Sequence, residues 1–147
     1  PQIISADVYK YIEKYKDENG RVSDEHTAKA YEELYENLAL HNQDTLLEIG
    51  VRHSDFNFKN LNKLKSKFNI TVVFCLLDKE VCRQRVIDRA AKDKSRFINM
   101  DAVEAKFKIP FPEEHYSAAT NMGVGFKNLD MTKTQEELQE FVSSLFV

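Results

Sequence analysis

Two acidic residues follow or lie within short apolar runs and have the chemistry for proton transfer. Asp7 comes directly after residues 3–6, and Glu48 lies between Leu47 and Ile49. A carboxylate in such a place can orient a hydroxyl group or accept its proton. Each also has a plainer interpretation. Asp7 is a good N-cap for a following helix, and Glu48 can point to a solvated strand end or pair with an arginine, because an unpaired buried carboxylate is costly.

Basic residues gather between residues 83 and 96, and two of them share a helical face. Arg85 and Arg89 are four residues apart, which places them on one side of a helix. The planar guanidinium fork suits phosphate oxygens, although a run of charge is also often a solvated helix face. Carboxylates beside arginines are the composition that phosphoryl transfer requires.

The apolar pattern predicts the elements that must position these residues. Strands are expected near 2–6, 44–49, 70–77 and 124–129, with helical patterns between them and after the last. This alternation is typical of an α/β fold with a parallel sheet between two layers of helices. The run 70–77 is apolar on both faces, as in an internal strand. Because ligands bind beyond the carboxyl ends of such strands, Asp7 and Glu48 are expected at the same sheet edge.

Composition indicates one soluble domain, 1–147, without repeats or linkers. The chain has 42% hydrophobic and 31% charged residues and a net charge of −3. This balance argues against nucleic acid as a generic partner, and no apolar run approaches the roughly 20 residues of a membrane span. No secretory signal opens the sequence, and Cys75 and Cys82 are expected as buried thiols. A cytoplasmic location follows as the default.

Four segments together resemble P-loop kinases of the zeta-toxin and small-metabolite-kinase type. "IISADVY", "TLLEIGVR" and "ITVVFCLLDKEVCRQRVIDRAAKD" look like the second, third and fourth strands of that family with their continuations, and "FKNLDMTKTQEELQEFV" is similar to its last strand and closing helix. The resemblance implies a three-layer P-loop kinase fold whose first strand–helix unit is not in the sequence.

The resemblance also implies roles for individual residues. Asp7 would act on the acceptor hydroxyl, while Glu48 and Arg52 would line the acceptor site. Arg85 and Arg89 would serve the transferred phosphoryl group from a helix leading into a lid-like segment over about 89–122. His53 follows Glu48 in the same loop and could contact the substrate, or be a solvated loop histidine. The four histidines lack metal-ligand spacing, so no metal site is expected.

The sequence departs from the family at the nucleotide site. The family's G-x-x-x-x-G-K-[ST] loop is not found, because none of the four glycines precedes a Lys-Ser or Lys-Thr pair at that spacing. ATP and Mg²⁺, expected for the intact family, should therefore not be bound by this sequence alone. Either the sequence is a fragment lacking about 25–35 residues, or it is a natural short protein beginning at Pro1. We favour the fragment, since the acceptor-side residues are intact.

Two functions of different classes follow. The first is the acceptor-and-lid portion of an ATP-dependent phosphotransferase, inactive as given, whose partner is a small-molecule hydroxyl acceptor such as a sugar, nucleoside or nucleotide-sugar. The alternative is a non-catalytic kinase-like binding or regulatory protein, with a protein partner covering the exposed sheet edge. A third interpretation, an N-terminal proline amine acting as base as in tautomerase-like enzymes, fits poorly with the helical middle of the chain.

Overall fold

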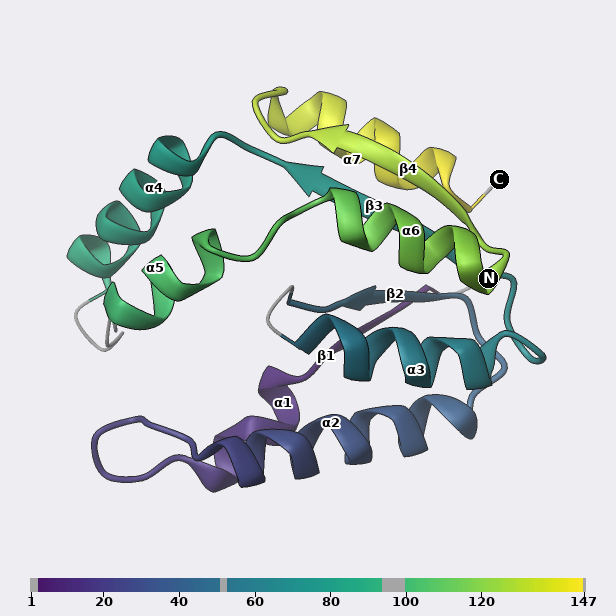
Figure 1. The fold of residues 1–147 in the computed structure, drawn as a ribbon, viewed down its shortest axis with the longest axis horizontal. Coiled ribbons are helices and arrows are strands. Elements are labelled where there is room, and N and C mark those ends of the chain that lie inside the picture. The colour runs from purple at the N-terminus through teal and green to yellow at the C-terminus, as the bar shows by residue number, and fades with distance from the viewer. Residues whose placement is uncertain (1–2, 51–52, 94–99, 147) are drawn as a thin grey trace. The chain divides into compact units, whose positions relative to one another are not determined.

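The computed structural model describes residues 3–50, 53–93 and 100–146, and the chain divides into two compact units. Unit 1 is Pro1–Asn69 and unit 2 is Ile70–Val147. Each contains one pair of parallel strands with helices packed around it (Figure 1). The chain is therefore a mixed α/β protein, as the alternating pattern predicted. The expectation of one continuous domain over 1–147 stays a prediction.

Unit 1 is built on two short strands that run in the same direction. Its elements are β1 (Ile4–Asp7), α1 (Tyr9–Ile12), a 3-10 helix (Glu13–Tyr15), α2 (Asp24–Ala39), β2 (Thr45–Glu48) and α3 (Ser54–Leu64). The register places Ile4 opposite Thr45 at one end and Asp7 opposite Glu48 at the other. The helices between the strands thus return the chain so that both carboxyl ends lie at one edge.

The long helix α2 supplies most of the core of unit 1. It begins after Ser23, whose hydroxyl accepts a hydrogen bond from the His26 N–H at 3.1 Å. One face of the helix is buried and consists of Ala30, Tyr31, Leu34, Tyr35 and Leu38. Figure 1 shows α2 and α3 on the same side of the β1–β2 pair. Residues on the other face of the pair, Ser5 and Leu46, are exposed.

Unit 2 has the same plan with longer strands. Its elements are β3 (Thr71–Leu76), α4 (Lys79–Lys92), α5 (Met100–Phe107), α6 (Glu113–Met122), β4 (Gly125–Asp130) and α7 (Gln135–Ser144). β3 and β4 are parallel over their whole length, from Thr71 opposite Gly125 to Leu76 opposite Asp130. A capping box begins α7, with Thr134 and Glu137 satisfying each other's backbone N–H groups.

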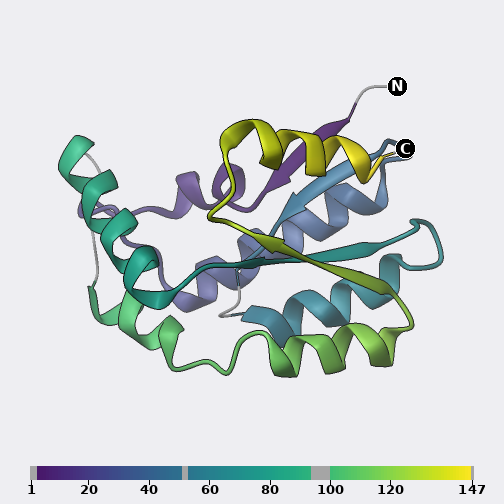
Figure 2. The ribbon, with the colours of Figure 1, turned by 90° about the horizontal axis from the view of Figure 1, so that it is seen from above.

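An aromatic cluster joins α6 to the sheet of unit 2. Phe74, 4% exposed, meets the Tyr116 ring edge-to-face at 4.9 Å and also contacts Phe126. The Tyr116 hydroxyl donates to Asn128 Oδ1 at 2.8 Å. The two ribbon views place α6 and α7 on opposite sides of the β3–β4 pair (Figures 1 and 2). The lid-like segment expected over 89–122 therefore includes a helix that belongs to the core of unit 2.

The four strands lie where the sequence predicted them, within two residues at each end, and every pairing is parallel. Among the described residues, however, they form two two-stranded sheets rather than one four-stranded sheet. Apolar periodicity identifies strands but does not choose their partners. β3, predicted as an internal strand, pairs with β4 alone there. Cys75 on β3 is exposed, which corrects the expectation of a buried thiol.

Candidate functional site

The carboxyl ends of β1 and β2 bring two acidic residues side by side. Asp7 and Glu48 are partners in the parallel register. Neighbouring strands lie about 4.8 Å apart, and register partners project from the same face of a sheet. Asp7 is half-buried and Glu48 is exposed. The prediction that the two residues share one sheet edge is confirmed, whereas their chemical roles stay predictions.

Asp7 also has the plainer role considered for it. Its Oδ1 accepts a hydrogen bond from the Tyr9 N–H at 2.9 Å, at the first residue of α1. This bond fixes the orientation of the carboxyl group through one of its two oxygens. Asp7 can therefore accept the hydrogen bond at the start of α1 and lie beside Glu48 at the same time.

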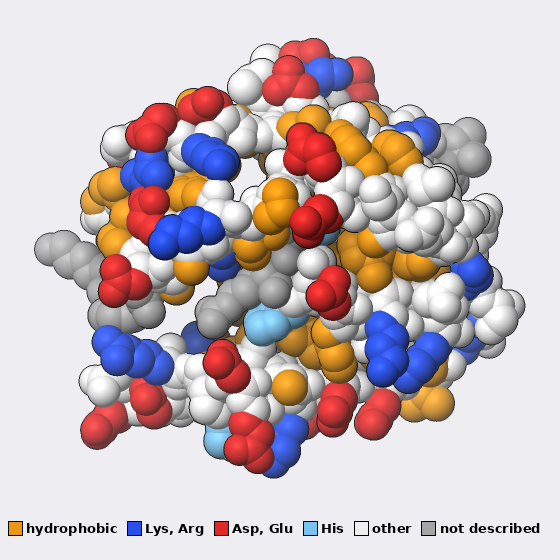
Figure 3. Space-filling model, viewed as in Figure 1, with side chains coloured by type: hydrophobic (Ala, Val, Ile, Leu, Met, Phe, Trp, Pro, Cys, Tyr) orange, Lys and Arg blue, Asp and Glu red, His pale blue; other side chains and the backbone are white. Residues whose placement is uncertain are grey.

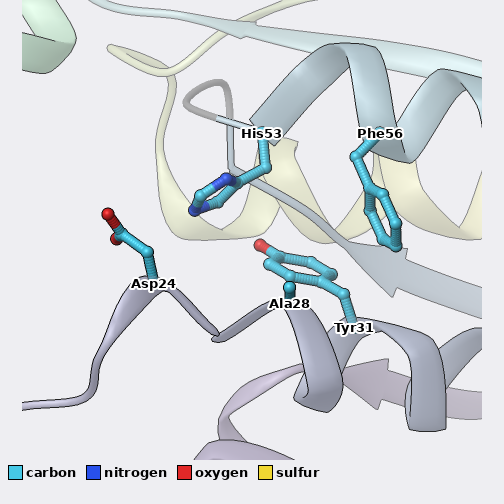
Figure 4. Close-up of a pocket in the computed structure, with 5 residues that line it drawn as sticks. All are labelled: Asp24, Ala28, Tyr31, His53 and Phe56. Carbon is cyan, nitrogen blue, oxygen red and sulfur yellow. The ribbon is translucent and has the colours of Figure 1, made fainter. Parts of the chain in front are cut away.

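A pocket of about 350 Å³ lies within unit 1, between α2 and α3. It is lined by Asp24, Ala28 and Tyr31 from α2, and by His53 and Phe56 at the start of α3. Figure 4 shows the Asp24 carboxylate, the His53 imidazole and the Tyr31 hydroxyl facing a common space, with the Phe56 ring further along the pocket. His53, proposed from sequence as a substrate contact, is thus placed in a concave site.

The Tyr31 side chain connects this pocket with the strand ends. Tyr31 is 5% exposed, and burial raises the pKa of its hydroxyl. The Asn57 amide and the Gly50 backbone partly offset this rise, whereas the nearby Tyr9 and Asp7 side chains add to it. The hydroxyl is therefore protonated at neutral pH and available as a donor close to Asp7.

Asn57 is a buried polar residue that sequence reasoning missed. It is fully buried, and its Oδ1 accepts a hydrogen bond from the Tyr35 hydroxyl at 2.7 Å. Burial raises the Tyr35 pKa well above its usual value. The Asn57 amide also lies near Tyr31, although its Nδ2 has no hydrogen-bond partner among the described residues. A signal was present: Asn57 lies four residues before Leu61, on the apolar stripe of its helix.

The predicted arginines have three different outcomes. Arg52 lies outside the described residues, so its assignment to the acceptor site stays a prediction. Arg85 is exposed on α4 and donates from Nη2 to the Met131 carbonyl at 3.4 Å, just beyond the carboxyl end of β4. Arg89 is exposed on the same helix. Their convergence with Asp7 and Glu48 concerns two separate units and stays a prediction.

Arg83, which was not singled out, has more contacts than either of these arginines. Its guanidinium makes a two-pronged contact with Glu104, with Nε–Oε1 at 2.6 Å and Nη2–Oε2 at 2.9 Å. It also pairs with Glu80 and lies 5.1 Å from the centre of the Phe107 ring. The hydrogen bonds from Arg83 lower the pKa of the Glu104 carboxyl group. Arg83 thereby ties α4 to α5, and the i,i+3 spacing from Glu80 was its only sequence signal.

The described glycines do not form a phosphate-binding loop. Gly20 closes a turn by donating to the Asp17 carbonyl, and Gly123 caps the end of α6 with a positive φ of 74°. Gly50 follows β2 and Gly125 begins β4. None opens a helix as the glycine-rich nest of a nucleotide site does. These glycines therefore do not supply a nest for the triphosphate of ATP, and the expectation that this sequence alone does not bind ATP and Mg²⁺ stays a prediction.

Residues 3–50, 53–93 and 100–146 contain no group of three or more His, Cys, Asp or Glu side chains that could hold a metal ion. No helix in these ranges has the length and apolar character needed to cross a bilayer. On the face that Figure 3 shows, basic side chains are interspersed with acidic ones. No protein family, curated protein or solved structure matches the chain.

Proposed function

We propose that the chain is the acceptor-and-lid portion of an ATP-dependent phosphotransferase acting on a small hydroxyl compound. The observation that carries the proposal is the pairing of Asp7 with Glu48 at the carboxyl ends of two parallel strands. A pocket suited to a small molecule lies in the same unit, and its Tyr31 is close enough to Asp7 to be affected by that charge. Parallel α/β sheets bind their ligands at this edge.

Asp7 is proposed to orient the acceptor hydroxyl and to accept its proton. The hydrogen bond from the Tyr9 N–H orients this carboxyl group, as a positioned general base requires. Glu48 and His53 would contact the acceptor, with Arg52 beside them as the family resemblance implies. Arg85 and Arg89 are proposed to neutralise charge on the transferred group within a three-layer P-loop kinase fold.

The test adds the phosphate-binding loop that was not found in this sequence. A strand, G-x-x-x-x-G-K-[ST] loop and helix from a zeta-toxin-like kinase is joined before residue 3, and transfer of radiolabelled phosphate from ATP is measured across a panel of sugars and nucleosides. We expect transfer by the fusion and none by the 147-residue chain. A folded fusion that binds ATP but labels no acceptor contradicts the proposal.

The second candidate is a kinase-like binding protein without catalysis. It is favoured by one observation: among the described residues, β3 pairs with β4 alone within unit 2, so its other edge has no backbone partner in that unit. To test it, proteins that bind the chain are first enriched from a cell extract by affinity. Hydrogen exchange of amides 71–76 is then compared with and without these proteins. Protection of β3 by a bound protein, together with an inactive fusion, would support this function over the first.

A further inference from the structure

We infer that Tyr9 is a substrate-contact residue, whose exposed ring packs against a cyclic ligand such as a pyranose or a nucleoside base held beside Asp7. The identification of this ligand as the phosphate acceptor rests on the proposed function, whereas its binding to Tyr9 does not. The inference narrows the small hydroxyl compounds of the proposed function to those with a ring, in preference to acyclic polyols.

Tyr9 is the one exposed tyrosine or phenylalanine in the described part of unit 1. It is 63% exposed, while Val8 before it is 7% exposed. The Tyr11 hydroxyl, by contrast, accepts a hydrogen bond from Asn37 Nδ2 at 2.6 Å, which attaches α1 to α2. Single exposed apolar side chains are common on protein surfaces, so exposure alone does not indicate a site. What distinguishes Tyr9 is its place beside Asp7.

The backbone of Tyr9 is fixed to the proposed general base. Its N–H donates to Asp7 Oδ1 at 2.9 Å. The next turn is also closed, because the N–H groups of Tyr11 and Ile12 both donate to the Val8 carbonyl at 2.9 Å. The Cα atom of Tyr9 therefore keeps one place relative to the Asp7 carboxyl group. Asp7 ends β1, at the edge where parallel α/β sheets bind ligands.

The Tyr9 side chain lies near the buried Tyr31 side chain of α2. Burial raises the pKa of the Tyr31 hydroxyl, and the nearby Tyr9 and Asp7 groups raise it further. The Gly50 backbone, just after β2, acts on the same hydroxyl in the opposite direction. Since such electrostatic effects weaken with distance, the Tyr9 and Asp7 side chains are both close to Tyr31. The Tyr9 ring therefore belongs to the carboxyl end of the strand pair.

A phenol ring in this position is suited to a cyclic ligand. Its face can pack against the apolar face of a sugar or base, and its hydroxyl can donate and accept hydrogen bonds. Tyrosine has only two side-chain torsions, so this contact orders little. An acyclic polyol offers no flat face and loses more internal freedom on binding. Among the described residues only Oδ1 of Asp7 is bonded, so Oδ2 can accept a hydrogen bond from a hydroxyl of the ligand.

A fluorescent reporter can be placed at this position, because the sequence contains no tryptophan. Tyr9→Trp in the 147-residue chain is titrated, without ATP, with two pairs of probes: glucose with sorbitol, and adenosine with ribitol. Leu40→Trp is the control, since Leu40 is 81% exposed at the end of α2 and precedes the start of β2. It also corrects for light absorbed by the probe.

We expect at least one cyclic probe to change the fluorescence of Tyr9→Trp in a saturable way, with an affinity about ten-fold or more above that of its acyclic partner. Leu40→Trp should not respond. The inference is overturned by equal responses of the two variants, by equal affinities within each pair, or by a response to neither cyclic probe.

Two further variants separate the ring from the backbone bond. Tyr9→Phe keeps the ring and Tyr9→Ala removes it, while both retain the N–H that bonds Asp7. Because the side chain is exposed, both variants should fold. Probe affinity, followed by chemical-shift changes in ¹H–¹⁵N spectra, should stay within about three-fold in Tyr9→Phe and fall about ten-fold in Tyr9→Ala, as for loss of an aromatic stacking partner. Unchanged affinity in Tyr9→Ala would remove Tyr9 from the site.

Kinetics of the fusion protein distinguish this inference from the proposed function. Tyr9→Ala should raise KM for a cyclic acceptor about ten-fold and leave kcat within about three-fold, because a stacking contact is made before and during transfer alike. Ring-selective binding together with an inactive fusion retains the Tyr9 contact and removes the phosphotransferase assignment. Transfer with a KM that Tyr9→Ala leaves unchanged retains the assignment and removes the contact.

Discussion

At the scale of single residues, Asn57 shows how the interior of unit 1 holds its candidate site. The residue is fully buried between two tyrosines of α2, bonding Tyr35 directly and lying near Tyr31. Tyr31 in turn lines the pocket. Because a buried amide has few alternative partners, it restricts where both hydroxyls can lie. Asn57 is therefore a positioning residue for the pocket wall.

Replacement of this residue should be costly. Asn57→Ala leaves the buried Tyr35 hydroxyl without its acceptor, and we expect a loss of about 1–3 kcal/mol in the free energy of unfolding. Asn62→Ala, an exposed asparagine on the same helix, should change it by less than about 0.5 kcal/mol. Chemical denaturation of the two variants measures the difference. Equal stabilities would mean that the Asn57–Tyr35 contact does not contribute.

The sequence predicted the candidate residues unevenly. Asp7 and Glu48 were found because strand ends are visible in apolar runs, and their position in those runs implied a common edge. Asp24, Tyr31 and Asn57 were not assigned to a site, because an amphipathic pattern marks a helix face as buried without showing which polar atoms meet there. Asp24 lies in the first turn of α2, where an acid is favoured whether or not a pocket is present.

At the scale of elements, the contact of Arg83 with Glu104 holds α4 against α5. The arginine lowers the pKa of Glu104 from its ordinary value of 4.5. A carboxyl group whose pKa is lower in the folded than in the unfolded state stabilises the fold at any pH above its unfolded pKa. This stabilisation is lost as the pH falls through the pKa of the folded state. The two helices should therefore separate more readily below about pH 4.5.

Carbon-13 NMR titration of the Glu104 carboxyl group measures this contact directly. In the unaltered chain the midpoint should lie below 4.5, and in Arg83→Gln it should return toward that value, because the guanidinium contact is removed. Arg85→Gln, on the same helix but bonded to Met131 instead, should leave the midpoint unchanged. The same midpoint in all three proteins would contradict the contact. High salt should reduce the shift, since both groups are only partly buried.

Arg89 offers a test of the role proposed for α4. In a fusion that transfers phosphate, Arg89→Ala should slow the transfer step and leave acceptor affinity largely unchanged, because a group serving the transition state acts on rate. Lys92→Ala, an exposed cation in the last turn of the same helix, is the matched control. Single-turnover rates and acceptor titrations provide the two readouts. If acceptor affinity falls together with the rate, Arg89 contributes to binding of the acceptor before the transfer step instead.

Helix boundaries were predicted better than contacts between helices. Ser23 and Thr134 cap α2 and α7, and such caps can be recognised in a sequence because capping is a local interaction within four residues. The contact between Arg83 and Glu104 spans 21 positions. No local rule selects that partner among the several acids and bases of this segment, so the pairing could not be read from the sequence.

At the scale of the whole molecule, the two units repeat one plan: a parallel strand pair whose carboxyl ends carry polar residues. In unit 1 these are Asp7 and Glu48, and in unit 2 β4 ends at Asp130, whose carboxylate accepts hydrogen bonds from the Thr132 hydroxyl and N–H. These bonds lower the pKa of Asp130. The sequence predicted four parallel strands, but the grouping of strands into pairs depends on backbone bonding that periodicity does not encode.

The most direct test of the central claim is the rate of phosphate transfer in the fusion protein when Asp7 is changed. We expect Asp7→Asn to reduce the rate about 10²–10⁴-fold, the range for loss of a positioned general base. Asp44→Asn, an exposed carboxylate immediately before β2 at the opposite end of the same strand pair, should leave the rate within about two-fold. Equal rates in the two variants would contradict the account, and so would transfer by the 147-residue chain without an added phosphate loop.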